Sequence, residues 1–197
     1  MYGVAIHPLR IVMEFAQHGD LNNFLVKTKK TPDRLPFLLK LRIAQDIARG
    51  MDYLGNLSPP IVHRDLRSPN VFLKSLDPSD SVCAVVADFG LSRRATRLAG
   101  SLDTWQWLAP EVLEGQEYGK QSDVYSFACV MYEILTHLPP FDEAYDNPEL
   151  TRVVTNENGQ ERCYVDQFKA REAIIDGYRP TLPPSIPQWL AVLIKRC

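Results

Sequence analysis

Residues 61–73 read IVHRDLRSPNVFL, and this stretch decides the fold of the chain. It contains the tripeptide His63-Arg64-Asp65, and Asn70 follows five residues after Asp65. Two further tripeptides come later in the chain, first Asp88-Phe89-Gly90 and then Ala109-Pro110-Glu111. The first tripeptide alone is weak evidence, but three separate motifs in one fixed order make a chance match implausible.

The spacing from His63 to Asn70 and the order of the later motifs resemble the catalytic loop and activation segment of protein kinases. The resemblance implies an α+β protein-kinase-like fold, with a mainly helical C-terminal lobe, short β-hairpins and most of the N-terminal lobe absent. Residues 1–197 would form one partial kinase domain. Within it, 1–20 would supply strands 4 and 5 and the hinge, and 21–197 a C-terminal lobe truncated in its last helices.

The match is closest to the tyrosine-kinase-like group of kinases. Within that group, three stretches resemble the Roco-type kinases: HRDLRSPN (63–70), NVFLKSLDPSDSVCAVVADFGLS (70–92) and WQWLAPE (105–111). One departure is Asp103, which replaces the glycine common before Thr104. Roco-type kinases sit beside a Ras-like GTPase domain and leucine-rich repeats, so the resemblance makes both domains candidate neighbours in the full-length chain.

Length and composition allow one domain with a proper core, because the chain has 197 residues of which 45 % are apolar. A net charge of −2 gives no indication of a nucleic-acid partner or an anionic membrane. The four cysteines have no closely spaced pair, which argues against a zinc site or disulfide framework and fits a reducing compartment. The most apolar stretch, around 124–135, is too short to span a bilayer. No secretory signal is visible, so we expect a cytoplasmic protein without a transmembrane segment.

The N-terminal residues predict a short hairpin followed by a capped helix. Residues 1–16 contain two strand-like stretches separated by a turn at 7–9, and the second stretch covers 10–15. Gly19 then breaks the strand, and Asp20 can cap a helix from 21 to about 27. Without the later motifs, a buried strand and a capped helix would be a sufficient interpretation of this region.

The kinase resemblance gives the same region a role in binding ATP. Met13 would be the gatekeeper behind the adenine, and the backbone of Glu14 and Ala16 would pair with the adenine edge. Asp20 would meet the ribose, and Leu73 would form the floor of the adenine pocket.

Two longer helices are predicted in the body of the chain. Residues 36–57 are amphipathic, with an inward face of Phe37, Leu41, Ala44, Ala48, Met51 and Leu54. Charged residues fall mostly on the other side: Lys40, Arg42, Asp46 and Arg49. Residues 122–135 are apolar almost all round, which predicts a buried helix with Ser122 as its N-cap. The resemblance makes Asp123 the residue that bonds the backbone of the catalytic loop.

The remaining elements are shorter. Strands at 71–73 and 82–86 predict a hairpin that places Asn70 and Asp88 near each other at one end. Residues 141–173 predict a surface insertion with a polar turn at 155–159. The next helix would end at 174–177, and a last helix would begin at Gln188.

Phosphoryl transfer depends on positioning and charge neutralisation more than on covalent chemistry. In the resemblance, Asp65 orients the alcohol nucleophile and takes its proton. Magnesium prefers hard oxygen ligands, and Asn70 and Asp88 would supply them to the Mg²⁺ that accompanies ATP. His63 and Phe89 are expected to be packing elements rather than proton carriers.

Two more residues are implied in catalysis. Arg67 stands where serine/threonine kinases usually carry Lys, and its guanidinium can still reach a γ-phosphate oxygen. Thr104 lies seven residues before Glu111, a position whose hydroxyl bonds the catalytic carboxylate in serine/threonine kinases. Both residues argue against a tyrosine kinase.

The activation segment, residues 88–111, offers candidate phosphorylation sites beside basic residues: Ser92, Thr96 and Ser101, near Arg93, Arg94 and Arg97. Arg64 precedes Asp65 and could bind such a phosphate through charge-assisted hydrogen bonds. The alternative is a basic, polar, flexible loop without a regulatory site.

Some parts of a complete kinase are not found in this sequence. The ten glycines contain no Gly-x-Gly, and no lysine with a helical glutamate partner precedes the hinge. The arginine that normally pairs with Glu111 is not found either, so this glutamate would be an unpaired charge. We therefore expect a fragment that transfers phosphate very poorly by itself.

Two functions remain open. The favoured one is a protein kinase that transfers the γ-phosphate of ATP to serine and threonine hydroxyls of proteins in signalling, because Asp65, Asn70 and Asp88 are all present. The alternative is a pseudokinase-like scaffold that docks partners without catalysis. A glycine-rich loop and a strand lysine upstream would mean an enzyme.

Overall fold

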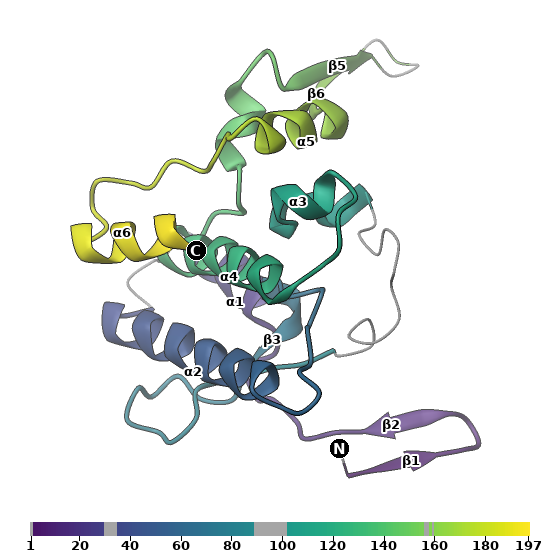
Figure 1. The fold of residues 1–197 in the computed structure, drawn as a ribbon, viewed down its shortest axis with the longest axis vertical. Coiled ribbons are helices and arrows are strands. Elements are labelled where there is room, and N and C mark those ends of the chain that lie inside the picture. Colours follow the sequence, from purple (N-terminus) through teal and green to yellow (C-terminus); the bar gives the residue numbers. More distant parts are fainter. Residues whose placement is uncertain (1, 30–34, 89–101, 156–157, 159) are drawn as a thin grey trace.

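The computed structural model describes residues 2–29, 35–88, 102–155, 158 and 160–197 (Figure 1). Its helices are α1 (Leu21–Thr28), α2 (Phe37–Gly55), α3 (Pro110–Leu113), α4 (Lys120–Thr136), α5 (Gln167–Ile175) and α6 (Gln188–Arg196). Short 3-10 helices are η2 (Ser68–Asn70), η4 (Leu102–Trp107) and η5 (Asp142–Asp146). The described strands pair as antiparallel hairpins: β1 (Gly3–Ala5) with β2 (Arg10–Val12), β3 (Val71–Leu73) with β4 (Ala84–Val86), and β5 (Thr151–Thr155) with β6 (Glu161–Val165).

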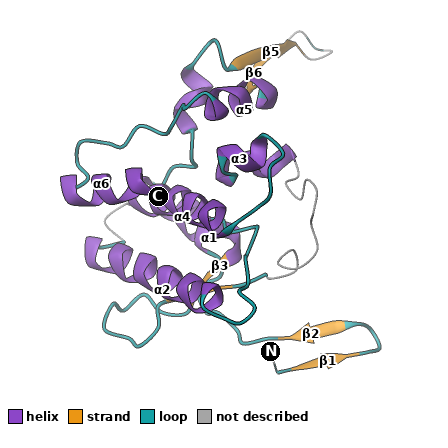
Figure 2. Ribbon diagram, viewed as in Figure 1, coloured by secondary structure: helices purple, strands orange, loops and turns teal. Residues whose placement is uncertain are grey.

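Helices dominate the described part of the chain, and its strands lie in small, separate hairpins (Figure 2). The mainly helical α+β architecture predicted from the motifs is therefore confirmed. In the same described residues, no helix has both the length and the apolar character needed to cross a bilayer.

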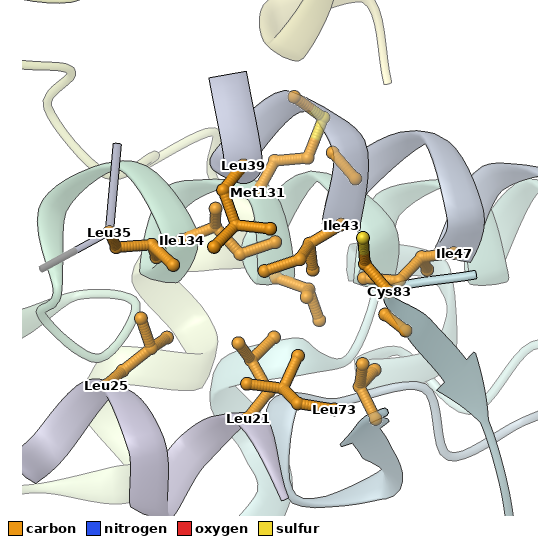
Figure 3. Packing of buried hydrophobic residues seen from close by; sticks show 14 of the residues in the cluster. Leu21, Leu25, Leu35, Leu39, Ile43, Ile47, Leu73, Cys83, Met131 and Ile134 are labelled. Carbon is orange, nitrogen blue, oxygen red and sulfur yellow. The ribbon is translucent and has the colours of Figure 1, made fainter. Parts of the chain in front are cut away.

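The main hydrophobic cluster lies between α2 and α4, with α1, β3, β4 and α6 around it. Side chains of Leu21, Ile43 and Ile134 come from three different helices and point into this shared interior (Figure 3). Each is 1 % exposed or less. Burial of such apolar surface is the main stabilising contribution to the fold.

The inward face predicted for α2 was partly wrong. Ala44 and Leu54 are buried as predicted, but Phe37 and Ala48 are exposed. The side chains that fill the core are Leu39, Ile43 and Ile47. Because steps of three and four residues fit two overlapping faces of this helix, only the hairpin packed against it selects one of them.

Asp46 was predicted on the charged face of α2 and is in fact buried. Its Oδ2 accepts hydrogen bonds from the backbone N–H groups of Cys83 (2.7 Å) and Ala84 (3.2 Å). These donors lie where β4 begins, so the carboxylate satisfies two strand N–H groups and ties the hairpin to α2.

The helix predicted at 122–135 exists as α4, but Ser122 is not its N-cap. The cap is Gly119, and Ser122 lies in the first turn, where its Oγ accepts a hydrogen bond from the Gly119 N–H at 3.2 Å. The Ser122 hydroxyl also donates to Glu111 at 2.7 Å. This half-buried carboxylate, expected to lack its arginine partner, therefore has a neutral hydrogen-bond donor.

Residues 141–173 were predicted to be a surface insertion, but Phe141, Ala144, Leu150 and Ala170 are buried in a second hydrophobic cluster. The same range contains a hairpin that was not foreseen. β5 and β6 pair from Thr151 opposite Val165 outward to Thr155 opposite Glu161. The base of the hairpin is fixed by the Asp166 N–H, which donates to the Leu150 carbonyl at 2.7 Å. α5 ends at Ile175, within the predicted range 174–177, and α6 begins at Gln188 as predicted.

The N-terminal hairpin β1–β2 is present with the predicted turn and extends away from the helical body (Figure 1). β2 ends at Val12, so the strand is shorter than the predicted 10–15. Met13, which follows it, is 63 % exposed.

Candidate active site

Helix α4 anchors the catalytic loop, residues 61–70, through a side chain that binds the loop backbone. Asp123 accepts hydrogen bonds from the backbone N–H groups of His63 (2.7 Å) and Arg64 (2.9 Å), as the sequence predicted. Burial raises the pKa of the Asp123 carboxyl, while the two N–H donors lower it and favour the charged form. The carboxylate thereby fixes the backbone immediately before Asp65.

His63 is a structural residue, as expected. It is completely buried, its Nε2 lies 3.0 Å from the Ala87 carbonyl oxygen, and its Nδ1 accepts from the Asp65 N–H at 3.3 Å. One imidazole therefore connects the catalytic loop with the chain just before Asp88. Phe89, the other expected packing residue, lies outside the described residues.

Three of the predicted catalytic side chains lie together. Asn70 Nδ2 donates to the Asp65 carbonyl and to Asp65 Oδ2, each at 2.8 Å. Arg67 Nε lies 3.2 Å from Asp65 Oδ1. The short helix η2 makes this possible, because it folds the chain back between Arg67 and Asn70.

Asp88 lies at the same end of the β3–β4 hairpin. Val71 pairs with Val86, and the Ala87 N–H donates to the Asn70 carbonyl at 2.9 Å, so Asp88 leaves the sheet next to Asn70. The residue is exposed and has a left-handed backbone with φ 65°. The predicted closeness of these chain positions is confirmed.

The donor set fits Mg²⁺. Because the Asn70 amide nitrogen faces Asp65, its oxygen is the atom left to serve as a ligand, beside the Asp88 carboxylate. Among the described residues, no group of three or more His, Cys, Asp or Glu side chains forms a metal cage. A site with only one or two protein ligands is typical of Mg²⁺, because this ion keeps several waters and binds substrate phosphates.

The predicted nucleotide-binding residues lie along the link between β2 and α1. Asp20 caps α1 as predicted, since its Oδ1 accepts the Asn23 N–H at 2.8 Å. Leu73 is completely buried in the main cluster, and its N–H donates to the Gly19 carbonyl at 2.9 Å. That bond joins the hinge region to β3.

The Glu14 carboxylate forms an ion pair with Lys74 Nζ at 2.6 Å, which raises the pKa of Lys74. Glu14 and Ala16 lie between the end of β2 and Asp20. The adenine and ribose contacts proposed for Met13, Glu14, Ala16, Asp20 and Leu73 remain predictions.

The C-terminal end of the activation segment lies against α4. Thr104 is half-buried in η4, and its bond to Asp65 remains a prediction. The candidate phosphorylation sites Ser92, Thr96 and Ser101 lie outside the described residues, as do Arg93, Arg94 and Arg97.

Besides Asp46, the sequence patterns missed a second buried acid. Glu133 lies on α4, in the stretch predicted to be apolar, and is 3 % exposed. Its Oε1 accepts from the Ser68 hydroxyl (2.6 Å) and its Oε2 from Trp107 Nε1 (2.8 Å). Burial raises the pKa of Glu133 to about 7. An acid inside an otherwise apolar helix was the available signal, because such groups are rarely buried without partners.

Comparison with known proteins agrees with this geometry. The family model described as "Protein tyrosine and serine/threonine kinase" matches residues 1–197. Two similar proteins from Dictyostelium discoideum are named "Probable serine/threonine-protein kinase roco11" and "Probable serine/threonine-protein kinase qkgA". Each is 41 % identical to this chain over its whole length. A third Dictyostelium protein, "Cyclic GMP-binding protein C", is 34 % identical over 99 % of the chain.

The chain spans only 12 % of the length of the first two relatives and 7 % of the third. The match therefore concerns one region of much larger proteins. The family model covers residues 1–197, a range that includes every motif of the site. The chain thus belongs to the protein tyrosine and serine/threonine kinase family.

Proposed function

We propose that this chain forms the large-lobe part of a serine/threonine protein kinase that transfers the γ-phosphate of ATP to protein hydroxyls. The observation that carries the proposal is the contact of the Asn70 amide with Asp65, at the end of the hairpin from which Asp88 emerges. In this proposal, the carboxylate that accepts the proton (Asp65) lies beside the two oxygen ligands of the phosphate-bound cation (Asn70 and Asp88).

Asp65 orients the substrate hydroxyl and accepts its proton. Arg67 binds the phosphate during transfer, and its contact with Asp65 supports this role. Asn70 and Asp88 would hold Mg²⁺, which would supply neutralisation of phosphate charge when it is bound. Thr104 fixes Asp65 from the activation segment.

Met13, Glu14, Ala16, Asp20 and Leu73 line the adenosine side of the site in this proposal. Their supporting observation is the backbone contact between Gly19 and Leu73, which brings the hinge region against the strand that follows Asn70. The ribose and the metal site would then lie on opposite sides of one short strand.

Arg67 and Thr104 favour serine and threonine over tyrosine as acceptors, and the relatives named serine/threonine-protein kinases agree with that choice. The Roco names among them support a Ras-like GTPase domain and leucine-rich repeats as neighbours in the full-length protein. We place that protein in the cytoplasm, as a partner of ATP and protein substrates rather than of nucleic acid.

The test uses the longest natural protein that contains this chain. Wild type, Asp65→Asn and the exposed control Asp52→Asn are incubated with γ-labelled ATP, Mg²⁺ and a peptide library containing Ser, Thr and Tyr acceptors. We expect Ser and Thr labelling, a loss of roughly 10³-fold or more in Asp65→Asn, and wild-type turnover in the control. No labelling by wild type, or equal labelling by Asp65→Asn, would contradict the proposal and favour a scaffold.

A further inference from the structure

Glu133 receives hydrogen bonds from two segments that are far apart in the sequence. Ser68 donates to one carboxylate oxygen at 2.6 Å, and the Trp107 indole donates to the other at 2.8 Å. Ser68 is completely buried and Glu133 is 3 % exposed, so water does not compete for these bonds. Each oxygen of the carboxylate therefore serves a different part of the molecule.

Ser68 lies inside the catalytic loop. It follows Arg67, whose Nε contacts the Asp65 carboxylate at 3.2 Å, and it begins the short helix η2 that ends at Asn70. A displacement of Ser68 would therefore move Arg67, the predicted phosphate ligand, and Asn70, the predicted Mg²⁺ ligand.

Trp107 ends η4, three residues after Thr104. Its carbonyl also accepts from the Ser126 hydroxyl at 2.7 Å, so α4 holds both the backbone and the indole of this residue. The end of the activation segment is thus attached to the same helix, and in part to the same side chain, as the catalytic loop.

From this geometry we propose that Glu133 is a positioning residue that couples the catalytic loop to the segment carrying Thr104. A shift of Trp107 is transmitted through the carboxylate to Ser68 and from there to Arg67 and Asp65. The effect of this coupling on phosphate transfer rests on the proposed function, whereas the coupling itself is a property of the fold.

A role in packing alone would not need an acid. Burying an ionisable group is costly, and an apolar side chain of similar volume usually fills such a position at least as well. Leucine at position 133 keeps most of the volume and removes both hydrogen bonds. Glutamine keeps both, because its amide oxygen can accept from Trp107 while its amide nitrogen donates to the Ser68 oxygen.

Hydrogen exchange measured by mass spectrometry tests the coupling without reference to activity. In Trp107→Phe, which loses the indole donor, we expect faster exchange in residues 61–70. In Ser68→Ala, we expect faster exchange in residues 104–113. Ile194→Val, at a buried position of α6, is the control for general loosening. If neither donor variant changes exchange in the opposite segment beyond this control, the coupling does not exist.

Activity measured in the longest natural protein tests the consequence. We expect Glu133→Leu to lower kcat roughly 10- to 100-fold with an unchanged KM for ATP, and Glu133→Gln to restore most of it. Equal losses in both variants would overturn a positioning role for the hydrogen bonds. If wild type transfers no phosphate, the proposed function fails, and hydrogen exchange still decides the coupling. Because Glu133→Leu could fail to fold, hydrogen exchange in the Trp107→Phe and Ser68→Ala variants tests the coupling independently of it.

Discussion

Glu133 is an acid that the fold holds away from water, and its ionisation should be visible in the stability of the whole chain. Its pKa rises from 4.5 to about 7 on folding, because burial penalises the charged form more than Ser68 and Trp107 favour it. Arg67 is the charged neighbour that lowers the pKa of Glu133, and Glu133 in turn raises the pKa of Cys129 on the same helix.

A raised folded-state pKa means that the folded chain binds the proton more tightly than the unfolded chain does. The contribution of Glu133 to stability is fully present below pH 4.5 and is lost as pH rises through 7. The loss amounts to roughly 3 kcal/mol, since one pKa unit corresponds to about 1.4 kcal/mol.

Glu133→Gln should abolish this pH dependence. Urea unfolding of wild type and variant should give similar free energies near pH 4.5, and the variant should be the more stable one near pH 8. Glu149→Gln, at an exposed acid, is the matched control and should follow wild type at both pH values. Parallel pH profiles for wild type and Glu133→Gln would show that Glu133 ionises normally.

Asp46 provides a second prediction at this scale. Asp46→Ala removes the acceptor of two buried N–H groups, so we expect a loss of about 2–4 kcal/mol in the free energy of unfolding. Asp52→Ala, on an exposed position of the same helix, should change it by less than about 0.5 kcal/mol. Similar values for both variants in urea titrations would mean that Asp46 does not support β4.

Among the elements, α2 shows most clearly that tertiary packing, in addition to the hydrophobic pattern, determines which face of a helix is buried. Ile43→Ala should cost about 2–5 kcal/mol, because it leaves a cavity where α2 meets α4. Leu38→Ala changes an exposed position of the same helix and should cost less than about 1 kcal/mol. Thermal or urea unfolding measures both, and equal losses would mean that the buried face of α2 has been assigned wrongly.

Features that depend on neighbouring residues could be predicted from the sequence. The cap on α1 links Asp20 to Asn23, three residues away, and the hairpin β3–β4 follows from two short apolar stretches around a polar turn. The motifs located Asp65, Asn70, Asp88 and Asp123 because their order is specific to one fold.

Features that depend on distant residues could not be predicted in the same way. Asp46 meets Cys83 across 37 residues, and Glu133 meets Ser68 across 65. The local pattern of α4 marks Glu133 as an acid within an apolar helix but does not identify its partners, and the pattern of α2 does not mark Asp46 at all. The hairpin β5–β6 was missed for a different reason, since its β-branched alternation was outweighed by the polar turn between the strands.

In the whole molecule, α4 contributes Val130, Met131 and Ile134 to the main hydrophobic cluster, and Tyr125 and Cys129 to a small one with Ala109. The main cluster contains α2 and α6, and a second cluster contains Trp105, Leu113, Phe141, Ala170 and Ile174. Residues before α4 and after it build this second cluster, and the chain then returns to the main cluster with Leu190 and Ile194 of α6. Residues early and late in the sequence therefore stabilise the same core.

The hairpin β5–β6 lies beyond both clusters and should be dispensable for folding. Residues 152–164 can be replaced by Asn-Gly, because Thr151 and Val165 already pair across the base. We expect the free energy of unfolding to change by less than about 1 kcal/mol. Ile174→Ala, within the second cluster, is the contrasting variant and should cost about 2–5 kcal/mol. Loss of cooperative unfolding after the excision would show that the hairpin is part of the core.

The exposed N-terminal hairpin has a practical consequence. Ile6, Leu9 and Ile11 are each more than 60 % exposed, and within the described residues β1 and β2 pair only with each other. Apolar strands with open edges are templates for pairing with another molecule. A concentrated sample of this polypeptide should therefore aggregate from this end, while the helical body remains folded.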